Sequence, residues 1–173
     1  NAKNLIDASK LVLPATTGYS CYEEMFYGCT SLVNAPELPA TTLANSCYYY
    51  MFYGCSQAVE FTMGAIEKIG SHAFYNCSSL ESITIPDIVT SIGDSAFSCN
   101  VFLENITIPN NVTSINRFAF SHCVSLEEII IPDSVTDIEE AVFYWCKSLR
   151  KVVVPHHLAY KDFYGEDFCE YVN

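Results

Sequence analysis

The chain has 173 residues, enough for one domain of ordinary size, and its 50% hydrophobic and 16% charged content excludes a disordered chain. Twenty acidic residues against eight basic ones give a formal net charge of −12, which argues against nucleic-acid binding because that needs a basic face. No stretch approaches the roughly 18 consecutive apolar residues of a membrane-spanning helix, so we expect no membrane insertion.

Residues 1–55 contain two copies of a long repeating unit. The sequence of Leu13–Thr17 recurs as Leu38–Thr42, and that of Met25–Cys29 recurs as Met51–Cys55, 26 residues later. The insertions fall between these segments, where changes in loop length cost little. We therefore treat residues 1–173 as one domain that begins with longer repeats.

Residues 56–155 repeat a shorter unit of 22 or 23 residues. Three kinds of residue recur at a fixed step of 23: Phe74, Phe97, Phe120, Phe143; Leu80, Leu103, Leu126, Leu149; Pro86, Pro109, Pro132, Pro155. A fixed period of this length indicates a solenoid, in which each unit buries its apolar stripe against copies of itself.

Each unit carries Leu-x-x-Ile-x-Ile-Pro, as in Leu80–Pro86. The alternation predicts a short strand with one buried face, and the proline ends it because it has no amide hydrogen. Aligned in this way, the chain predicts seven strands, near residues 11–13, 36–38, 61–63, 83–85, 106–108, 129–131 and 152–154. The side chains expected inside are Ile83, Ile85, Ile106, Ile108, Ile129 and Ile131.

Between the strands, Ile92, Ala96, Phe97 and Asn100 have near-helical spacing, which predicts a turn or two of helix. The predicted fold is an α/β, right-handed solenoid with one parallel sheet of about seven short strands, and with short helices or turns opposite. Residues 156–173 depart from the repeat and are polar, as expected for a C-terminal cap.

The repeat resembles the BspA-like leucine-rich repeats of bacterial surface proteins. The shared pattern is Ile-Gly-x-x-Ala-Phe-x-x-Cys-x-Ser-Leu-x-x-Ile-x-Ile-Pro-x-x-Val-Thr, matched at residues 69–90, 92–113, 115–136 and 138–155. Departures stand at Asn116 and Glu139 in the glycine column and at Asn100 in the cysteine column. The resemblance implies a secreted or surface-displayed module that adheres to proteins or glycans of a host or of neighbouring cells.

Nine cysteines raise the question of disulfides or a metal site. Cys29, Cys55, Cys77, Cys123 and Cys146 each follow the repeat phenylalanine by three residues, and Cys21 and Cys47 occupy an isoleucine slot. Core slots favour reduced, buried thiols, although neighbours in a column lie within disulfide reach. No Cys-x-x-Cys pair suggests zinc, and the neighbours His122 and Cys123 are interpreted as a surface histidine beside a buried thiol. We expect no cofactor.

Residues beside the inward isoleucines should point outward, because side chains alternate along a strand. They form two ladders, one of Thr84, Thr107, Ile130 and Val153 and the other of Ser82, Asn105, Glu128 and Lys151. Glu37 and Thr62 should extend the first ladder. Ile130 and Val153, rimmed by Glu128 and Lys151, have the character of a protein-binding patch, although β-branched residues also favour strands for their own sake.

A second candidate surface is the run Tyr48, Tyr49 and Tyr50. Exposed tyrosine is well suited to recognition, because it offers a large area at a low entropic cost. The alternative is that these rings fill space under the longer loops.

The sequence contains no motif that frames a catalytic pair, a nucleophile or a phosphate loop. We therefore expect a non-catalytic, monomeric interaction module at the cell surface or outside the cell. The alternatives are a structural spacer and the repeat region of a larger surface protein or enzyme.

Overall fold

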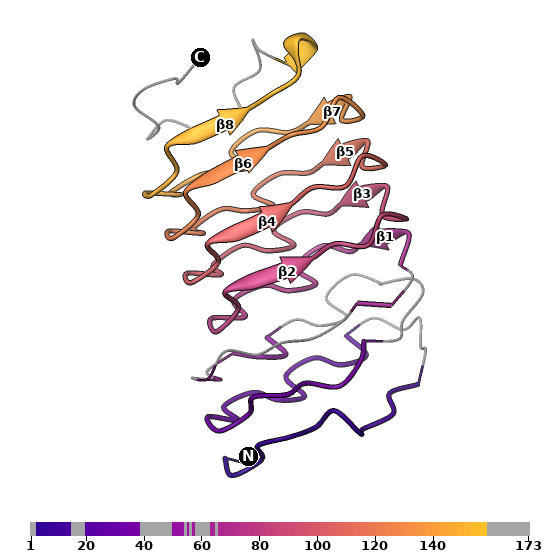
Figure 1. Cartoon of the computed structure of the whole chain (residues 1–173), viewed down its shortest axis with the longest axis vertical. Coiled ribbons are helices and arrows are strands. Elements are labelled where there is room, and N and C mark those ends of the chain that lie inside the picture. The colour runs from indigo at the N-terminus through magenta and orange to yellow at the C-terminus, as the bar shows by residue number, and fades with distance from the viewer. Residues whose placement is uncertain are drawn as a thin grey trace.

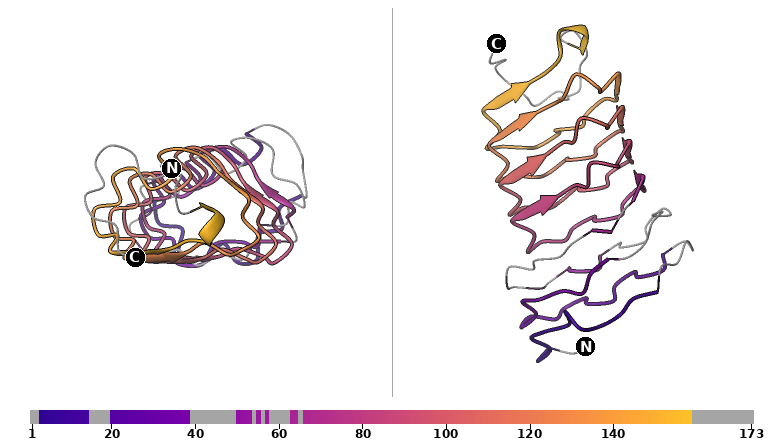
Figure 2. Two further views of the ribbon diagram at one scale, coloured as in Figure 1. Left: turned by 90° about the horizontal axis from the view of Figure 1, so that it is seen from above. Right: turned by 45° about the vertical axis from the view of Figure 1, so that its right-hand side comes forward.

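The computed structural model describes residues 3–14, 20–38, 50–53, 55, 57, 63–64 and 66–158. The chain winds into a stack of coils that climbs from the N-terminus to the C-terminus (Figure 1). Seen along the stack, the coils lie one above another (Figure 2). The predicted solenoid is confirmed, with parallel strands wherever strands pair.

One row along the stack consists of four three-residue strands: β2 (Ser82–Thr84), β4 (Asn105–Thr107), β6 (Glu128–Ile130) and β8 (Lys151–Val153). Each strand starts one residue before its predicted start, and each has a buried central residue between two exposed ones. The six isoleucines expected inside are all buried, so the predicted direction of the side chains is confirmed. We call these four strands the strand row.

The strand row is not one continuous sheet, and on this point the prediction was wrong. β2 pairs with β4 and β6 pairs with β8, each in register at the 23-residue step. β4 and β6 are neighbours in the stack but form no ladder with each other (Figure 1). The row therefore consists of two separate two-stranded sheets.

A second row of strands, absent from the sequence prediction, runs along the other edge of the coils in Figure 1. It consists of the two-residue strands β1 (Lys68–Ile69), β3 (Ser91–Ile92), β5 (Ser114–Ile115) and β7 (Asp137–Ile138). These form one four-stranded parallel sheet in that order. In each strand the isoleucine is buried and the preceding residue is not. A β-branched residue suits such a half-buried extended segment.

The N-terminal coils pair through single bridges between Asp7 and Asn34 and between Leu38 and Met63. The strand expected over residues 11–13 is absent, and residues 36–38 contribute only the Leu38 bridge. Phe61 and Thr62, which belong to the third expected strand, lie outside the described residues. The expected count of seven strands in one sheet is thus not confirmed.

The segments expected to be helical are turns. The one helix in the described residues is the 3₁₀ helix η1 (His156–Leu158). In the coil of Phe74, the N–H groups of His72, Phe74 and Asn76 donate to carbonyls of the next coil, each at 2.8 Å. His72 and Asn76 have positive φ values of 57° and 55°. Left-handed backbone conformations recur along the turn and point every second amide at the neighbouring coil. These amides cannot form the i to i−4 hydrogen bonds of an α-helix.

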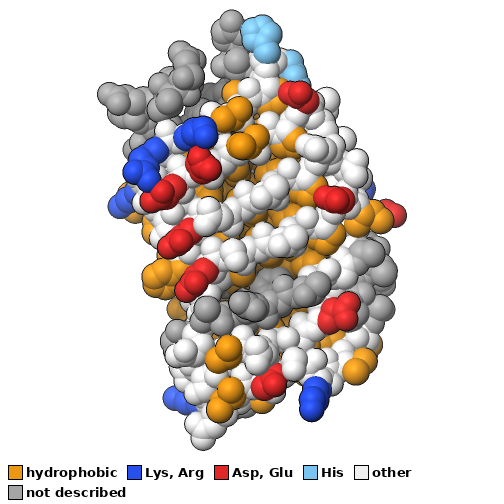
Figure 3. Space-filling view, in the orientation of Figure 1, with side chains coloured by type: hydrophobic (Ala, Val, Ile, Leu, Met, Phe, Trp, Pro, Cys, Tyr) orange, Lys and Arg blue, Asp and Glu red, His pale blue; other side chains and the backbone are white. Residues whose placement is uncertain are grey.

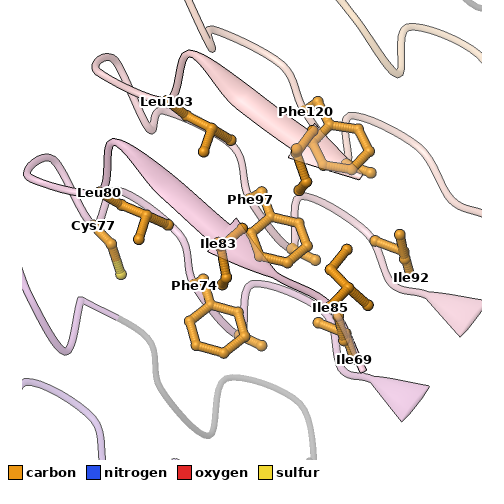
Figure 4. Packing of buried hydrophobic residues seen from close by; sticks show 14 of the residues in the cluster. Ile69, Phe74, Cys77, Leu80, Ile83, Ile85, Ile92, Phe97, Leu103 and Phe120 are labelled. Carbon is orange, nitrogen blue, oxygen red and sulfur yellow. The ribbon is translucent and has the colours of Figure 1, made fainter. Parts of the chain in front are cut away.

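The core lies between the two strand rows and these turns. Stacked phenylalanine rings run through it, with centroids 5.4 Å apart for Phe74 and Phe97, 5.5 Å for Phe97 and Phe120, and 5.9 Å for Phe120 and Phe143. Figure 4 shows the first three rings of this column, with Leu80 and Leu103 in a second column beside them. Each coil therefore buries its apolar stripe against the next coil.

The predicted C-terminal cap is described only in part. Leu158, at the end of η1, is buried against the last coil. Residues 159–173 lie outside the described part of the chain.

Candidate functional site

The eight predicted ladder residues all lie exposed on the outer face of the strand row. Their registration follows the strand pairs: Ser82 beside Asn105, Thr84 beside Thr107, Glu128 beside Lys151 and Ile130 beside Val153. The structure thus assembles them into one surface, as the alternation along the strands predicted. Glu37 is also exposed, whereas Thr62 lies outside the described residues.

The face divides into two chemically different halves. On β2 and β4 the outward side chains are hydroxyls and an amide, whereas β6 and β8 present the apolar Ile130 and Val153, which are 57% and 43% exposed. Glu128 and Lys151 border these two residues and form an ion pair at 3.1 Å. Both partners are more than half exposed, and such pairs contribute only about 0–1 kcal/mol. A partner could therefore rearrange this pair at little cost.

A pocket of about 330 Å³ opens where the two halves meet, between β4 and β6. Its lining consists of Asn105, Ile106, Thr107, Ile108, Asn110, Glu128, Ile129, Ile130 and Pro132. The isoleucines at positions 106, 108 and 129 are buried, so they form an apolar floor below a polar rim. The pocket coincides with the break in the strand row, and no motif in the sequence predicted it.

Acidic side chains border the strand row where its strands begin. Glu81, Glu104 and Glu127 are exposed and recur at the 23-residue step, each directly before a strand. The N–H of Glu104 donates to the carbonyl of Glu81 at 3.0 Å, so these two residues lie on neighbouring coils. Figure 3 shows acidic side chains gathered along this edge of the face. We call these three residues the acidic column.

The basic residues on this face form ion pairs between the last two coils. Arg150 pairs with Glu127 and Lys151 pairs with Glu128. Among the residues that the structure describes, no ion pair involves Glu81 or Glu104. The acidic column was missed in the sequence, although its constant step of 23 could have revealed it.

The tyrosine surface is only partly described. Tyr48 and Tyr49 lie outside the described residues. Tyr50 is half-buried, and its ring makes edge contacts with Tyr53 and Tyr75, both at 5.4 Å between centroids. Tyr50 and Tyr53 lie in the turn that contains Phe52, and Tyr75 lies in the turn that contains Phe74. For Tyr50, the interpretation as a packing residue has structural support.

The cysteines that follow each repeat phenylalanine by three residues are buried and offer no reactive nucleophile. Cys29, Cys55, Cys77, Cys123 and Cys146 are free and buried, as predicted. The thiols of Cys55, Cys123 and Cys146 donate to backbone carbonyls of the preceding coil at 3.1 to 3.3 Å. Burial raises the pKa of Cys146 to about 12, which leaves it protonated at neutral pH.

The prediction that the cysteines are reduced is wrong for Cys21. It is disulfide-bonded, and its partner lies outside the described residues.

The side chains of His122 and Cys123 have different hydrogen-bond partners. The Nδ1 atom of His122 lies 2.7 Å from the Oγ atom of Ser121, and the thiol of Cys123 donates to the carbonyl of Phe97 at 3.3 Å. Within the described ranges, no group of three or more His, Cys, Asp or Glu side chains could hold a metal ion. The same ranges contain no helix that is long and apolar enough to cross a membrane.

Comparison with known proteins identifies the repeat. A family model described as "BspA type Leucine rich repeat region (6 copies)" matches residues 3–100 and 45–165. A search of curated proteins found no match.

Solved structures of bacterial leucine-rich repeat proteins are similar in fold. The leucine-rich repeat protein of T. pallidum is 29% identical, with a TM-score of 0.64 over 76% of this chain and 60% of its own. A leucine-rich repeat protein of Bacteroides ovatus is 29% identical, with a TM-score of 0.56 over 87% of this chain and 33% of its own. A leucine-rich cell surface protein of Faecalibacterium prausnitzii is 25% identical, with a TM-score of 0.54 over 81% of this chain and 46% of its own. This chain therefore spans between a third and three fifths of their lengths.

Proposed function

Since the chain belongs to the family of BspA-type leucine-rich repeat proteins, we propose that it is a non-catalytic protein-interaction module whose partner docks on the outer face of the strand row. The observation that carries this proposal is the pocket between β4 and β6, which lies directly beside the exposed Ile130. An apolar patch with a polar rim on a regular solenoid face is typical of a protein-binding surface.

The proposed location is the cell surface or the extracellular space. One similar structure is that of a leucine-rich cell surface protein. The proposed role there is adhesion to a macromolecule of a host or a neighbouring cell, with the module acting as a monomer. The net charge of −12 disfavours self-association through its acidic faces.

The test uses a double substitution, Ile130→Asp with Val153→Asp, in a protein whose partner has first been isolated from extracellular proteins and glycans. Each aspartate places a charge where the partner would bury an apolar side chain, so we expect affinity to fall by about tenfold or more. The matched control is Met25→Asp with Val33→Asp, which changes two apolar residues of the N-terminal coils that are 41% and 40% exposed. The control should bind like the unmodified protein.

Circular dichroism and thermal melting establish that both variants remain folded. Unchanged affinity of the folded Ile130→Asp, Val153→Asp protein would move the site away from the strand row. Failure to isolate any partner that depends on this face would favour a structural spacer within a longer protein.

A further inference from the structure

The charge and shape of the face specify its partner more closely than the family does. We infer, on the premise that the strand row is the docking face, that it takes a lysine- or arginine-containing polypeptide segment. An apolar side chain of that segment enters the pocket between β4 and β6, and its basic side chains lie along Glu81 and Glu104.

The pocket accounts for the apolar part of this inference. It joins the amide and hydroxyl of Asn105 and Thr107 to the apolar Ile130 across the break in the strand row. At about 330 Å³ it lies near the lower end of the range for small-molecule pockets, about 300–1,000 Å³, and has room for a single large side chain. Its rim of backbone, amide and hydroxyl groups can accept or donate hydrogen bonds to the peptide that carries this side chain.

The acidic column accounts for the basic part. Glu104 directly precedes Asn105 of the pocket lining, and Glu81 lies on the coil before it, joined to Glu104 by the backbone hydrogen bond of 3.0 Å. Coils in such a stack repeat at about 4.8 Å, so the two carboxylates repel each other across a short distance. A cationic side chain between them removes that repulsion. On the next coils the protein supplies its own cations, because Arg150 pairs with Glu127 and Lys151 with Glu128.

The glutamates that border the strand row thus differ in whether they have an ion-pair partner. Glu127 and Glu128 are neutralised from within the described part of the chain, whereas Glu81 and Glu104 have no ion pair there. Asp87, exposed at the opposite end of β2, adds a further negative charge around the same half of the face. Charge complementarity therefore favours a basic partner at β2 and β4, and an acidic polysaccharide or nucleic acid would be repelled.

The test uses nuclear magnetic resonance of the isotopically labelled protein with three synthetic peptides. The first is Lys-Lys-Gly-Leu-Gly-Lys-Lys, the second has glutamate in place of every lysine, and the third has glycine in place of leucine. The first peptide should shift the amide signals of Asn105, Thr107 and Ile130. The second should not shift them, and the third should lose the shifts at the pocket while keeping weaker ones near Glu81 and Glu104.

A matched pair of variants separates local from overall charge. Glu81→Gln with Glu104→Gln should weaken binding of the first peptide about fivefold at low salt, because two attractive contacts are lost. Glu23→Gln with Glu24→Gln removes two exposed carboxylates from a turn of an N-terminal coil and changes the net charge equally. This control should change the affinity less than twofold.

Each of the following outcomes would overturn the inference. The glutamate peptide could shift the same amides as strongly as the lysine peptide, or the Glu81→Gln, Glu104→Gln protein could bind as tightly as the control, and either result would exclude a basic partner. Shifts confined to other coils, or none from any peptide, would exclude the pocket. Maltoheptaose, an uncharged oligosaccharide, is titrated in parallel, and shifts at the pocket from it but not from the peptides would assign the face to a neutral glycan. None of these results decides the proposed function, which the Ile130→Asp, Val153→Asp assay tests with the native partner.

Discussion

Five of the six free cysteines in the described part of the chain lie one above another beside the phenylalanine column. A thiol fits this position because it is small and apolar, and it can still donate a weak hydrogen bond to the carbonyl of the coil below. Of these six, only Cys99 is partly exposed, and its Sγ atom lies 3.6 Å from the hydroxyl oxygen of Tyr75. Position in the coil therefore decides which thiols solvent can reach.

The thiol column predicts selective labelling. At pH 8 a maleimide should modify Cys99 in the native protein and leave Cys77 and Cys123 unmodified until denaturant is added, as peptide mapping by mass spectrometry would show. Burial raises the pKa of Cys77 to about 12, so almost no thiolate is present. Cys99→Ser is the control and should abolish the fast labelling among the six free cysteines. Rapid modification of Cys77 in native protein would contradict the buried column.

The same pKa shift has a consequence for alkaline stability. Since the folded pKa of Cys77 exceeds the unfolded value of 9.0, the native state favours the protonated thiol, and its stabilising contribution is complete below pH 9. It is lost as the pH rises from 9 toward 12. Burial raises the pKa of Cys146 to the same value and that of Cys55 to about 11, so all three act in one direction.

Asn100 shows what the cysteine position requires. It is fully buried, and its Nδ2 atom donates to the carbonyls of Phe74 at 3.0 Å and Phe97 at 2.7 Å. It therefore replaces the thiol donor with an amide donor. Its Oδ1 atom is buried without a partner among the described residues. The sequence identified this position as a departure from the pattern, but only the structure shows which groups it contacts.

Among the elements, the strands of the strand row were the most predictable. Alternation in segments such as Ile83–Ile85 has period two, and the following proline fixes where the strand ends. The second row of strands was missed because its members are two residues long, as in Ser91–Ile92, too short to show a period. Of the short helices or turns expected opposite the sheet, turns are present around Ala96 and Phe97, because an irregular turn can bury Ile92, Ala96 and Phe97 together as well as a helix can.

The turns predict an unusual response to glycine. Ala141 has a φ of 55°, a conformation that costs an L-residue about 1–2 kcal/mol, so Ala141→Gly should stabilise the protein by about 0.5–1 kcal/mol. Ala119, one position before Phe120, is fully buried and has no positive φ. Ala119→Gly should destabilise by about 1–2 kcal/mol, since it loses a buried methyl group and gains backbone entropy in the unfolded chain.

Urea unfolding of the three proteins measures both effects. Equal destabilisation by the two substitutions would mean that the left-handed conformation at Ala141 stores no strain.

For the whole molecule, the outward face of the strand row was predictable and its pocket was not. Thr107 and Ile130 are exposed because side chains alternate along a strand, which the sequence reveals. The pocket between them lies where β4 and β6 form no ladder, which is a relation between two whole coils. No local sequence pattern shows whether two coils complete a ladder. The acidic column could have been found, because its glutamates keep the same step as the isoleucines.

The net charge of −12 predicts that salt stabilises the fold. Raising NaCl from about 10 mM to about 200 mM shortens the screening length from roughly 30 Å to below 10 Å and should raise the melting temperature by a few degrees. The three ion pairs in the described ranges oppose this only weakly, because all are exposed.

Differential scanning calorimetry measures how steeply the melting temperature rises with the NaCl concentration. Glu81→Gln with Glu104→Gln should reduce this rise. A melting temperature that falls with salt would show that the ion pairs outweigh the general repulsion.

The near-constant spacing of the phenylalanine rings, 5.4 to 5.9 Å from Phe74 to Phe143, has a consequence for the gene. Each coil meets the one below through nearly the same contacts, so removal or duplication of 23 codons would join two surfaces that already fit. Unequal recombination between repeats would therefore yield folded proteins of different lengths. Such events would also change how many coils separate Glu81 from Ile130, so that binding specificity could evolve through repeat number without any point mutation.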